Sequence, residues 1–248
     1  MNIRNAWQTC KQLLGLFYIV IRYENRMPLP DNYDNRAKYI LPFEGVWTVA
    51  NGGATQELSH SWDMYTQRFA YDFFIMDENG NTYNGELENP KSYYCYGLNI
   101  LAPADGTVVH VEERCKDSII DGKKAHCNSH HLCGNHIVIK HADDEYSFIA
   151  HLMNDSITVK IGDLVTQGQY IAKCGNTGNS FEPHLHFHLQ NKKSFFTSIG
   201  LPIEFTGIAA QSNTNSHLFT PLKTQRDYIE ISGKKYIGRG MDVENMMR

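Results

Sequence analysis

Hydrophobic and polar positions change their pattern near residue 40 of this chain of 248 residues. An apolar run from Leu13 to Ile21 predicts a helical arm over 1–40, which ends in a turn-rich connection with Pro28 and Pro30. Beyond it, short β-branched and aromatic runs punctuated by Gly, Asn, Asp and Pro are typical of an antiparallel β protein. We expect strands near 46–50, 68–76, 106–112, 135–141, 145–151, 157–161, 169–174 and 184–190.

Two polar segments interrupt these strands. Residues 77–97 predict a long loop, and a second insertion runs from about 115 to 134. From about 208 the chain becomes rich in Ser, Asn and Thr, and a hairpin is expected around Gly233. We therefore divide the chain into an arm (1–40), a β domain (41–207) and a C-terminal extension (208–248).

The start of the chain has a cationic front and an apolar run that is too short to span a bilayer. No small-residue cleavage site follows before Arg22, so a cleavable signal peptide is not indicated. A helix docked on the domain and a membrane-surface or uncleaved export segment both remain open. Any membrane contact through residues 1–25 is expected to be weak.

Charge and cysteine content exclude few classes of function. A formal net charge of −4 and the lack of a Lys/Arg run argue against nucleic-acid binding. The cysteines are scattered and do not reveal the compartment. The segment HCNSHHLC (126–133) has the composition of a zinc loop but no second ligand pair, so we favour a disulfide or a polar loop there and expect no second zinc. The six cysteines are Cys10, Cys95, Cys115, Cys127, Cys133 and Cys174.

The segment EPHLHFHLQ (182–190) places His184, His186 and His188 at two-residue spacing. Side chains at i and i+2 of a strand share a face, so these imidazoles project into one space. The strand could simply be polar and solvent-facing, with its apolar residues packed inward. Because imidazole is both the commonest side-chain metal ligand and a base near neutral pH, one strand could instead supply a ligand and a base. His188 is expected to be exposed.

Several short sequence motifs precede or overlap this histidine-rich segment in a fixed order. They resemble the lysostaphin-type zinc endopeptidases, which include the LytM-like cell-wall hydrolases, closely over about 100–190 and loosely over 41–75. The resemblance implies an antiparallel β-sandwich or barrel-like domain, the duplicated hybrid motif. The motifs are GNHIVIKH (134–141), AHL (150–152), VKIGDLVTQGQYIA (159–172), GNTG (175–178) and PHLHF (183–187).

The resemblance also implies roles for individual residues. The second histidine of H-x-H, His186, would bind zinc, and the first, His184, would be catalytic. The histidine of A-H-L, His151, would be its partner. The family's usual H-x-x-x-D is absent, but a subgroup resembling this chain uses a wider spacing before Q-R-x-A-x-D, so His60 and Asp72 are assigned as the other ligands.

Asp63 competes with Asp72 because it lies only three residues from His60. Asp72 is favoured because it lies in an alternating run, where it would occupy a defined face of a rigid strand. The alternative for Asp72 is a carboxylate at a strand edge that is paired with Arg68. His110, His136, His141 and His217 are interpreted as surface or edge histidines.

The function that the resemblance implies is zinc-dependent hydrolysis of peptide bonds in peptidoglycan stems or cross-bridges. Two histidines and one carboxylate leave a zinc position open for water, whose pKa falls toward about 7. His151 and His184 could share proton transfer and oxyanion stabilisation. The resemblance favours the cell envelope or the extracellular space. The alternatives are a non-catalytic binding or activator module, and a phosphotransfer or biotinyl-like carrier with related turns.

Overall fold

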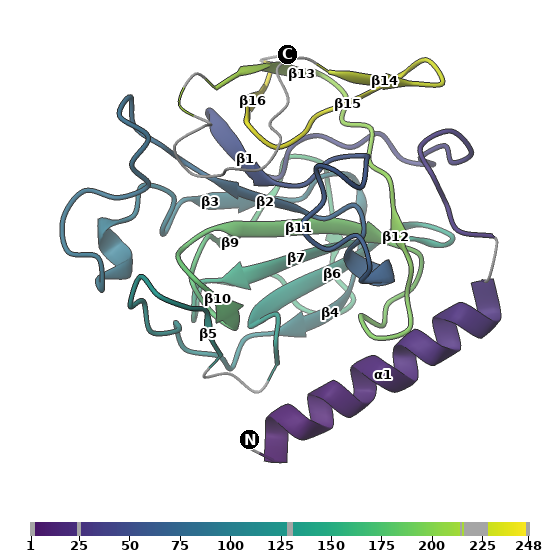
Figure 1. Ribbon diagram of the computed structural model, residues 1–248, viewed down its shortest axis with the longest axis horizontal. Helices are drawn as coiled ribbons and strands as arrows, with labels where there is room; N and C mark the ends of the chain where they lie inside the picture. The colour runs from purple at the N-terminus through teal and green to yellow at the C-terminus, as the bar shows by residue number, and fades with distance from the viewer. Residues whose placement is uncertain (1–2, 24–25, 128–130, 214, 216–227, 247–248) are drawn as a thin grey trace.

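The alternating segments of the chain form the strands of one large antiparallel sheet (Figure 1). The computed structural model describes residues 3–23, 26–127, 131–213, 215 and 228–246. Within them, α1 (Ile3–Tyr23) is the one α-helix, and the rest is mainly antiparallel β structure. The fold class expected from the sequence is confirmed.

The strands are short, and most connections between them are irregular. Two 3-10 turns, η1 (Tyr65–Gln67) and η2 (Pro90–Ser92), occur in the connections that precede β2 and β3. The strands are β1 (Trp47–Asn51), β2 (Tyr71–Phe74), β3 (Asn99–Leu101), β4 (Gly106–Glu112), β5 (His126–Cys127), β6 (Asn135–Ala142), β7 (Glu145–Leu152), β8 (Leu164–Val165), β9 (Tyr170–Lys173), β10 (Asn179–Ser180), β11 (Leu185–Gln190), β12 (Gly200–Leu201), β13 (Ile208–Ser212), β14 (Ile229–Ile231), β15 (Lys234–Tyr236) and β16 (Met241–Asn245).

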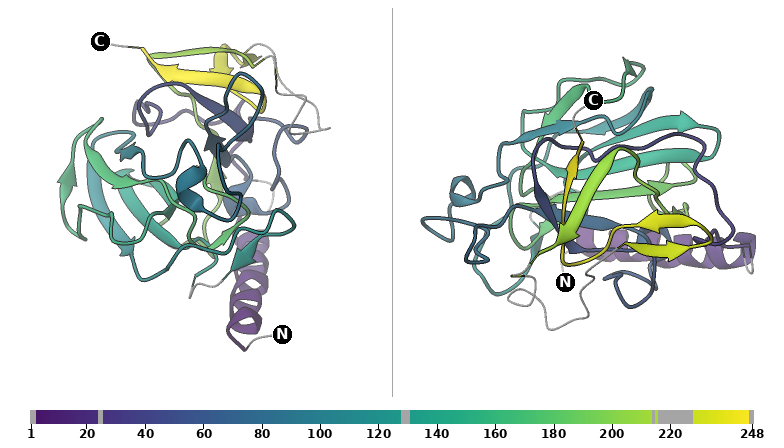
Figure 2. Two further views of the ribbon diagram at one scale, coloured as in Figure 1. Left: turned by 90° about the vertical axis from the view of Figure 1, so that its left-hand side faces the viewer. Right: turned by 90° about the horizontal axis from the view of Figure 1, so that it is seen from above.

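Ten of the described strands belong to the main sheet, in the order β13-β16-β1-β2-β11-β7-β6-β4-β8 with β12 paired to β11. Strands from the end of the chain, β13 and β16, thus extend the sheet beside β1 (Figure 2). The pairs β3-β9, β5-β10 and β14-β15 are separate and antiparallel. The central strands of the main sheet are therefore β2, β11 and β7, which come from distant parts of the sequence.

The core lies on one side of these central strands. Phe73 of β2, Ile149 of β7 and Phe187 of β11 are fully buried there, together with Ile100 of β3 and Ile171 of β9. Because side chains alternate along a strand, the residues between these apolar positions face the opposite side of the sheet. That opposite face carries the histidines singled out in the sequence.

Helix α1 lies along the edge of the molecule (Figure 2). Gly15 sits against the backbone of Phe196, where a Cβ would lie only 1.9 Å from the carbonyl oxygen, so glycine allows the close approach. Asn191 and Lys192 donate hydrogen bonds to the hydroxyls of Tyr23 and Tyr18. No helix in the described part of the chain has the length and apolar composition needed to cross a bilayer.

Two expectations about local structure were wrong. Residues 157–161 form no strand, because their backbone groups bond singly, Ile157 to the Glu113 carboxylate and Thr158 to the Ile171 carbonyl. His136 is not a surface residue. It is 2% exposed on β6 and stacks on Phe148 of β7.

Candidate metal centre and catalytic cleft

Asp72 and His186 face each other across two neighbouring strands. The antiparallel register pairs Asp72 of β2 directly with His186 of β11, and both side chains leave the sheet on the face opposite the core. The Nδ1 atom of His186 lies 2.8 Å from Oδ1 of Asp72. Asn51, the partner of Asp72 on β1, places its amide nitrogen 3.4 Å from Oδ2 of the same carboxylate.

His60 reaches this carboxylate from a loop. The loop leaves β1 at Gly52 and turns back over β2, so that Nε2 of His60 lies 3.4 Å from Oδ2 of Asp72. Burial lowers the pKa of His60 more than the Asp72 charge raises it. Burial would raise the pKa of Asp72, but His60 and the hydrogen bond to His186 outweigh it and hold that pKa well below its ordinary value.

A chain of hydrogen bonds behind His186 fixes which ring nitrogen faces Asp72. The side-chain nitrogen of Gln190 donates to the carbonyls of Lys192 and Lys193, which leaves its Oε1 as an acceptor 3.0 Å from Nε2 of His188. Nδ1 of His188 then accepts from Nε2 of His186 at 3.0 Å. With a zinc ion in place of the proton that Nδ1 shares with Asp72, His186 would keep its proton on Nε2, donated to His188, and would present Nδ1 as the ligand.

This arrangement corrects the expectation for His188. The residue is fully buried, not exposed, and its ring stacks on Phe148 with centroids 4.9 Å apart. Burial lowers its pKa well below the ordinary value, which is consistent with a neutral ring. His188 thus supports His186 from behind.

The donor set fits a zinc ion. One ligand atom from each of His60, Asp72 and His186 can be chosen so that all lie within 4.8 Å of one another. Among the residues that the structure describes, no other group of three His, Cys, Asp or Glu side chains meets this condition. Two imidazoles and one carboxylate are a zinc ligand set that leaves a coordination position open, and a ligand histidine whose second nitrogen is held is typical of such sites.

His184 and His151 lie beside these three residues. Nδ1 of His184 donates to the carbonyl of Glu182 at 2.7 Å, and Nε2 lies 3.8 Å from Oδ1 of Asp72. Nδ1 of His151 donates to the carbonyl of Thr177 at 2.7 Å. Since a carbonyl only accepts, each ring has its free lone pair on Nε2. The two ring centroids are 4.7 Å apart.

The backbone around His151 is held in an unusual conformation. His151, the residue before the last one of β7, has φ of 61°, in the left-handed region that a residue with a side chain adopts at a cost. Its partner carbonyl belongs to Thr177, which packs against Gly134; a Cβ on Gly134 would lie 2.3 Å from that carbonyl. Burial and then His184 lower the pKa of His151 well below its ordinary value, so the ring is neutral near pH 7.

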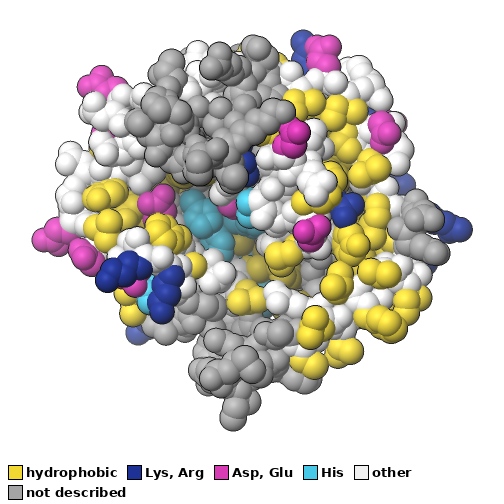
Figure 3. Space-filling view, in the orientation of Figure 1, with side chains coloured by type: hydrophobic (Ala, Val, Ile, Leu, Met, Phe, Trp, Pro, Cys, Tyr) yellow, Lys and Arg dark blue, Asp and Glu magenta, His cyan; other side chains and the backbone are white. Residues whose placement is uncertain are grey.

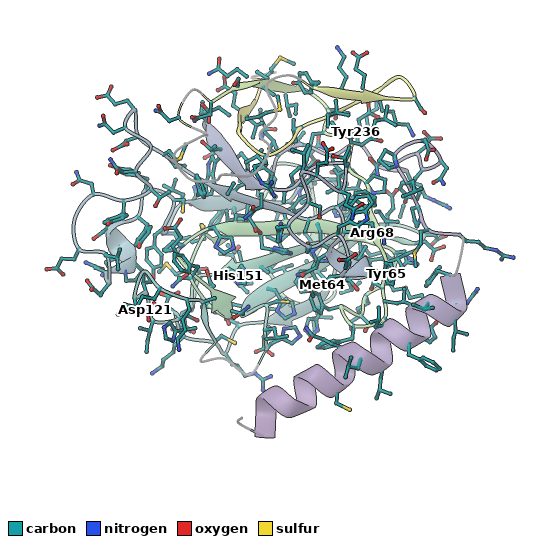
Figure 4. All side chains as sticks on the ribbon, in the orientation of Figure 1. Met64, Tyr65, Arg68, Asp121, His151 and Tyr236 are labelled. Carbon is teal, nitrogen blue, oxygen red and sulfur yellow. The ribbon has the colours of Figure 1, made fainter. Side chains whose placement is uncertain are left out.

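All five residues line one open cleft of about 620 Å³. In Figure 3 histidine side chains lie in a central hollow with acidic side chains beside it. His151 and Met64, both labelled in Figure 4, contribute to its wall, as does Gln12 of α1. The structure thus brings together the residues that the sequence singled out, namely His60, Asp72, His151, His184 and His186.

The competing assignments lie elsewhere. Asp63 lines a separate pocket between η1 and α1. Arg68 does not pair with Asp72; its Nε donates to the carbonyl of Trp62 at 3.0 Å, and its guanidinium stacks over Trp62 and Tyr65. In the 126–133 loop, Nε2 of His126 lies 2.7 Å from Oδ2 of Asp121, whereas the Cys127 side chain and residues 128–130 lie outside the described parts of the chain.

Sequence reasoning missed one residue of this region. Arg239, between β15 and β16, is 1% exposed and donates to the carbonyls of Leu58 at 2.8 Å and Glu57 at 3.4 Å, just before His60. Its Nε is buried without a hydrogen-bond partner. Nothing in the local sequence signals this contact, because it depends on β16 pairing with β1.

Comparisons with known proteins agree with this chemistry. Residues 93–197 match the sequence model of Peptidase family M23. The peptidoglycan DD-endopeptidase ShyB of Vibrio cholerae is 44% identical over 69 residues, which are 28% of this chain and 16% of that protein. The murein hydrolase activator NlpD of Escherichia coli is 36% identical over 96 residues, which are 39% of this chain and 21% of that protein. This chain therefore matches only about a fifth or less of these relatives' lengths.

Solved structures align less closely. A zinc-containing peptidase from Vibrio cholerae gives a TM-score of 0.40 at 23% identity and covers 70% of this chain and 45% of that one. The catalytic domain of lysostaphin from Staphylococcus simulans gives a TM-score of 0.34 at 21% identity and covers 67% of this chain and 90% of that domain. Alignments at these TM-scores assign no role to individual residues.

Proposed function

Since residues 93–197 place the chain in peptidase family M23, we propose that it is a zinc-dependent endopeptidase that hydrolyses peptide bonds in peptidoglycan stems or cross-bridges. The observation that carries the proposal is the convergence of His60, Asp72 and His186 in one cleft, with His151 and His184 beside them. The similarity to a peptidoglycan endopeptidase supports the substrate class.

In this proposal His60, Asp72 and His186 hold the zinc ion. Bound there, zinc would act as a Lewis acid that lowers the pKa of water and polarises a peptide carbonyl. His188 and Gln190 keep the His186 ring in one orientation and one tautomer through the hydrogen bonds described above.

His184 and His151 handle the protons. The Glu182 carbonyl keeps a proton on Nδ1 of His184, so Nε2 is the atom that can accept a proton from attacking water and deliver it to the leaving amine. Nε2 of His151 likewise faces the cleft with its lone pair, so it can accept a hydrogen bond from the attacking water and orient it.

A second function, an activator of other murein hydrolases, has its own support in the 36% identity to NlpD. Non-catalytic members of the family lack several of the site residues, whereas this chain has both proton-transfer histidines and three ligand candidates. We therefore favour catalysis.

Digestion of purified cell walls tests the choice. The zinc-loaded chain alone should release new peptide amino termini, and chelation should abolish the release while added zinc restores it. An activator would release none by itself and would raise hydrolysis only when a second murein hydrolase is added.

A further inference from the structure

One acidic side chain in the cleft has no role among the residues described so far. Glu182 is half-buried and lines the cleft next to His184. Its carboxylate accepts a hydrogen bond from the hydroxyl of Thr82 at 3.1 Å, and no ion pair joins it to any described residue. Burial raises the pKa of Glu182, against smaller opposite effects of Thr82 and His184.

The wall of the cleft carries acidic side chains but no lysine or arginine among the described residues. The acidic residues are Asp72 and Glu182. The charge of Asp72 would be offset by the zinc ion that Asp72 holds together with His60 and His186. Glu182 therefore contributes a partly desolvated negative charge without a cationic partner, and a ligand that brings a cation would offset that cost.

The position of this carboxylate relative to the reacting groups is fixed. The carbonyl of Glu182 accepts hydrogen bonds from Nδ1 of His184 at 2.7 Å and from the hydroxyl of Ser180 at 2.8 Å. The same residue thus orients His184 through its backbone and presents its side chain to the cleft. A substrate group that contacts this side chain lies close to the bond that His184 acts on.

We propose that Glu182 forms an ammonium subsite, which selects peptides that carry a primary amine close to the scissile bond. The proposal rests on the peptidase function argued above and deepens it. The amine belongs either to the side chain of a diamino acid or to the amino terminus of a short peptide. A carboxylate favours this group because a charged donor forms a stronger hydrogen bond than a neutral one, and a carboxylate on the substrate would be repelled.

The experiment compares three forms of one cell-wall peptide: both amines free, the side-chain amine acetylated, and the amino terminus acetylated. For the wild-type chain loaded with zinc, acetylating one of the two amines should lower kcat/KM by about tenfold or more, the scale of a charge-assisted hydrogen bond. The sensitive amine identifies the source of the ammonium group. No effect of either acetylation would overturn the proposal.

Glu182→Gln keeps the shape of the side chain and removes the charge. It should lower kcat/KM for the free-amine peptide about tenfold, leave the sensitive acetylated form nearly unchanged, and keep full zinc content. Glu86→Gln, an exposed residue of the same insertion as Thr82, is the matched control and should change neither rate. An equal loss on all peptides would mean that Glu182 is only structural.

Equilibrium binding separates this proposal from the peptidase function. If the wild-type chain cleaves none of the peptides, the peptidase function fails, and binding of the same peptides to the metal-free chain then tests the subsite. Preference for the free amine that disappears in Glu182→Gln supports the subsite even then. Equal affinity of both chains for all three peptides overturns it.

Discussion

In three histidines around Asp72, a hydrogen bond fixes one ring nitrogen and leaves the other nitrogen available to the cleft. Carbonyls hold Nδ1 of His151 and His184, and His188 holds Nε2 of His186. Hydrogen bonds to fixed acceptors decide the tautomer of an imidazole, and they cost no reorganisation during the reaction. At this scale the site is a set of rings whose orientation is determined before any ligand arrives.

His188→Ala tests the support of His186. Removing the acceptor of His186 Nε2 should weaken zinc affinity about 10–100-fold, the usual effect of losing such a partner, and should lower activity only as far as zinc is lost. Zinc titration of the metal-free variant measures it. His110→Ala, a half-buried histidine away from the cleft, is the control and should keep the wild-type affinity. Unchanged affinity in both variants would mean that His188 has no role at the metal centre.

The sequence could predict much of the site at this scale, and the reason is local. The two-residue spacing of His184, His186 and His188 puts all three on one face of β11. It could not show that this face is buried, because that depends on Phe195 and on His136 and Phe148 of the neighbouring strands β6 and β7. His188 was therefore misread as exposed.

Among the elements, α1 is the one whose outer face has no partner within the described chain. Leu13, Leu14, Phe17 and Ile21 are 63–67% exposed, and hydrophobic side chains gather over this part of the molecule in Figure 3. The helix contains no acidic residue, and Arg22 lies in its last turn. An apolar face bordered by cations fits an anionic lipid surface.

Co-sedimentation with vesicles that contain anionic lipid measures this contact. The full chain should bind, and high salt should weaken the binding. Replacing Leu13 and Phe17 by Gln should lower the affinity about a hundredfold or more, since each side chain loses roughly 1.5–3 kcal/mol of apolar burial. A chain that stays off the vesicles, or that uses the same face to dimerise, would contradict the lipid contact.

Strands β4, β6 and β7 bury His136, and this makes stability depend on pH. Burial lowers its pKa to about 3. The ring therefore stays neutral in the folded state, while the unfolded chain takes up a proton below about pH 6.5. Because the unfolded state then binds more protons, stability falls as the pH drops below 6.5. The titratable groups around the ring are His110, Glu112, His131 and His188.

Denaturant unfolding at pH 8 and pH 5 compares the wild type with His136→Phe. The wild type should lose stability between these values, with His136 accounting for at most about 1.4 kcal/mol per pH unit. His136→Phe should lose less, because an apolar ring of similar size does not titrate. Equal losses in both chains would show that His136 is protonated in the folded state.

Strands were predicted correctly where a segment with alternating or continuous apolar residues also pairs with a neighbouring strand of the sheet. Residues 106–112 form β4 as expected, and β6 and β7 each extend one residue beyond the range expected for them. Residues 157–161 have the composition of a strand, but the backbone hydrogen bond from Thr158 to Ile171 of β9 is not continued into a ladder. Composition therefore identifies extended chain, whereas pairing is decided by the rest of the sheet.

In the whole molecule, three separate parts of the chain supply or support the candidate ligand and proton-transfer residues of the cleft. The segment that matches the family, 93–197, supplies His151, His184 and His186. His60 and Asp72 precede it, and Arg239 follows it. Because β1 and β2 lie between β16 and β11 in the sheet, the C-terminal extension supports the loop that carries His60. A sequence pattern limited to neighbouring residues could not show this contact.

Arg239→Met should therefore affect both folding and the metal centre. It leaves the carbonyls of Glu57 and Leu58 without their donor, which should cost about 1–3 kcal/mol in the free energy of unfolding. Zinc titration of the folded variant should show weaker binding, and Arg239→Lys should restore part of it. Arg114→Met removes an exposed arginine and should change neither quantity. Normal zinc binding in Arg239→Met would make Arg239 purely structural.

The central claim is that one strand, β11, supplies both a zinc ligand and a proton-transfer group, and zinc content measured beside cell-wall hydrolysis tests it most directly. His186→Ala should lose most of its zinc together with its activity, because a three-ligand site tolerates no further loss. His184→Ala should keep nearly one zinc per chain and lose activity by about 100-fold or more. Full zinc in His186→Ala, zinc loss in His184→Ala, or unchanged hydrolysis in both variants would contradict it.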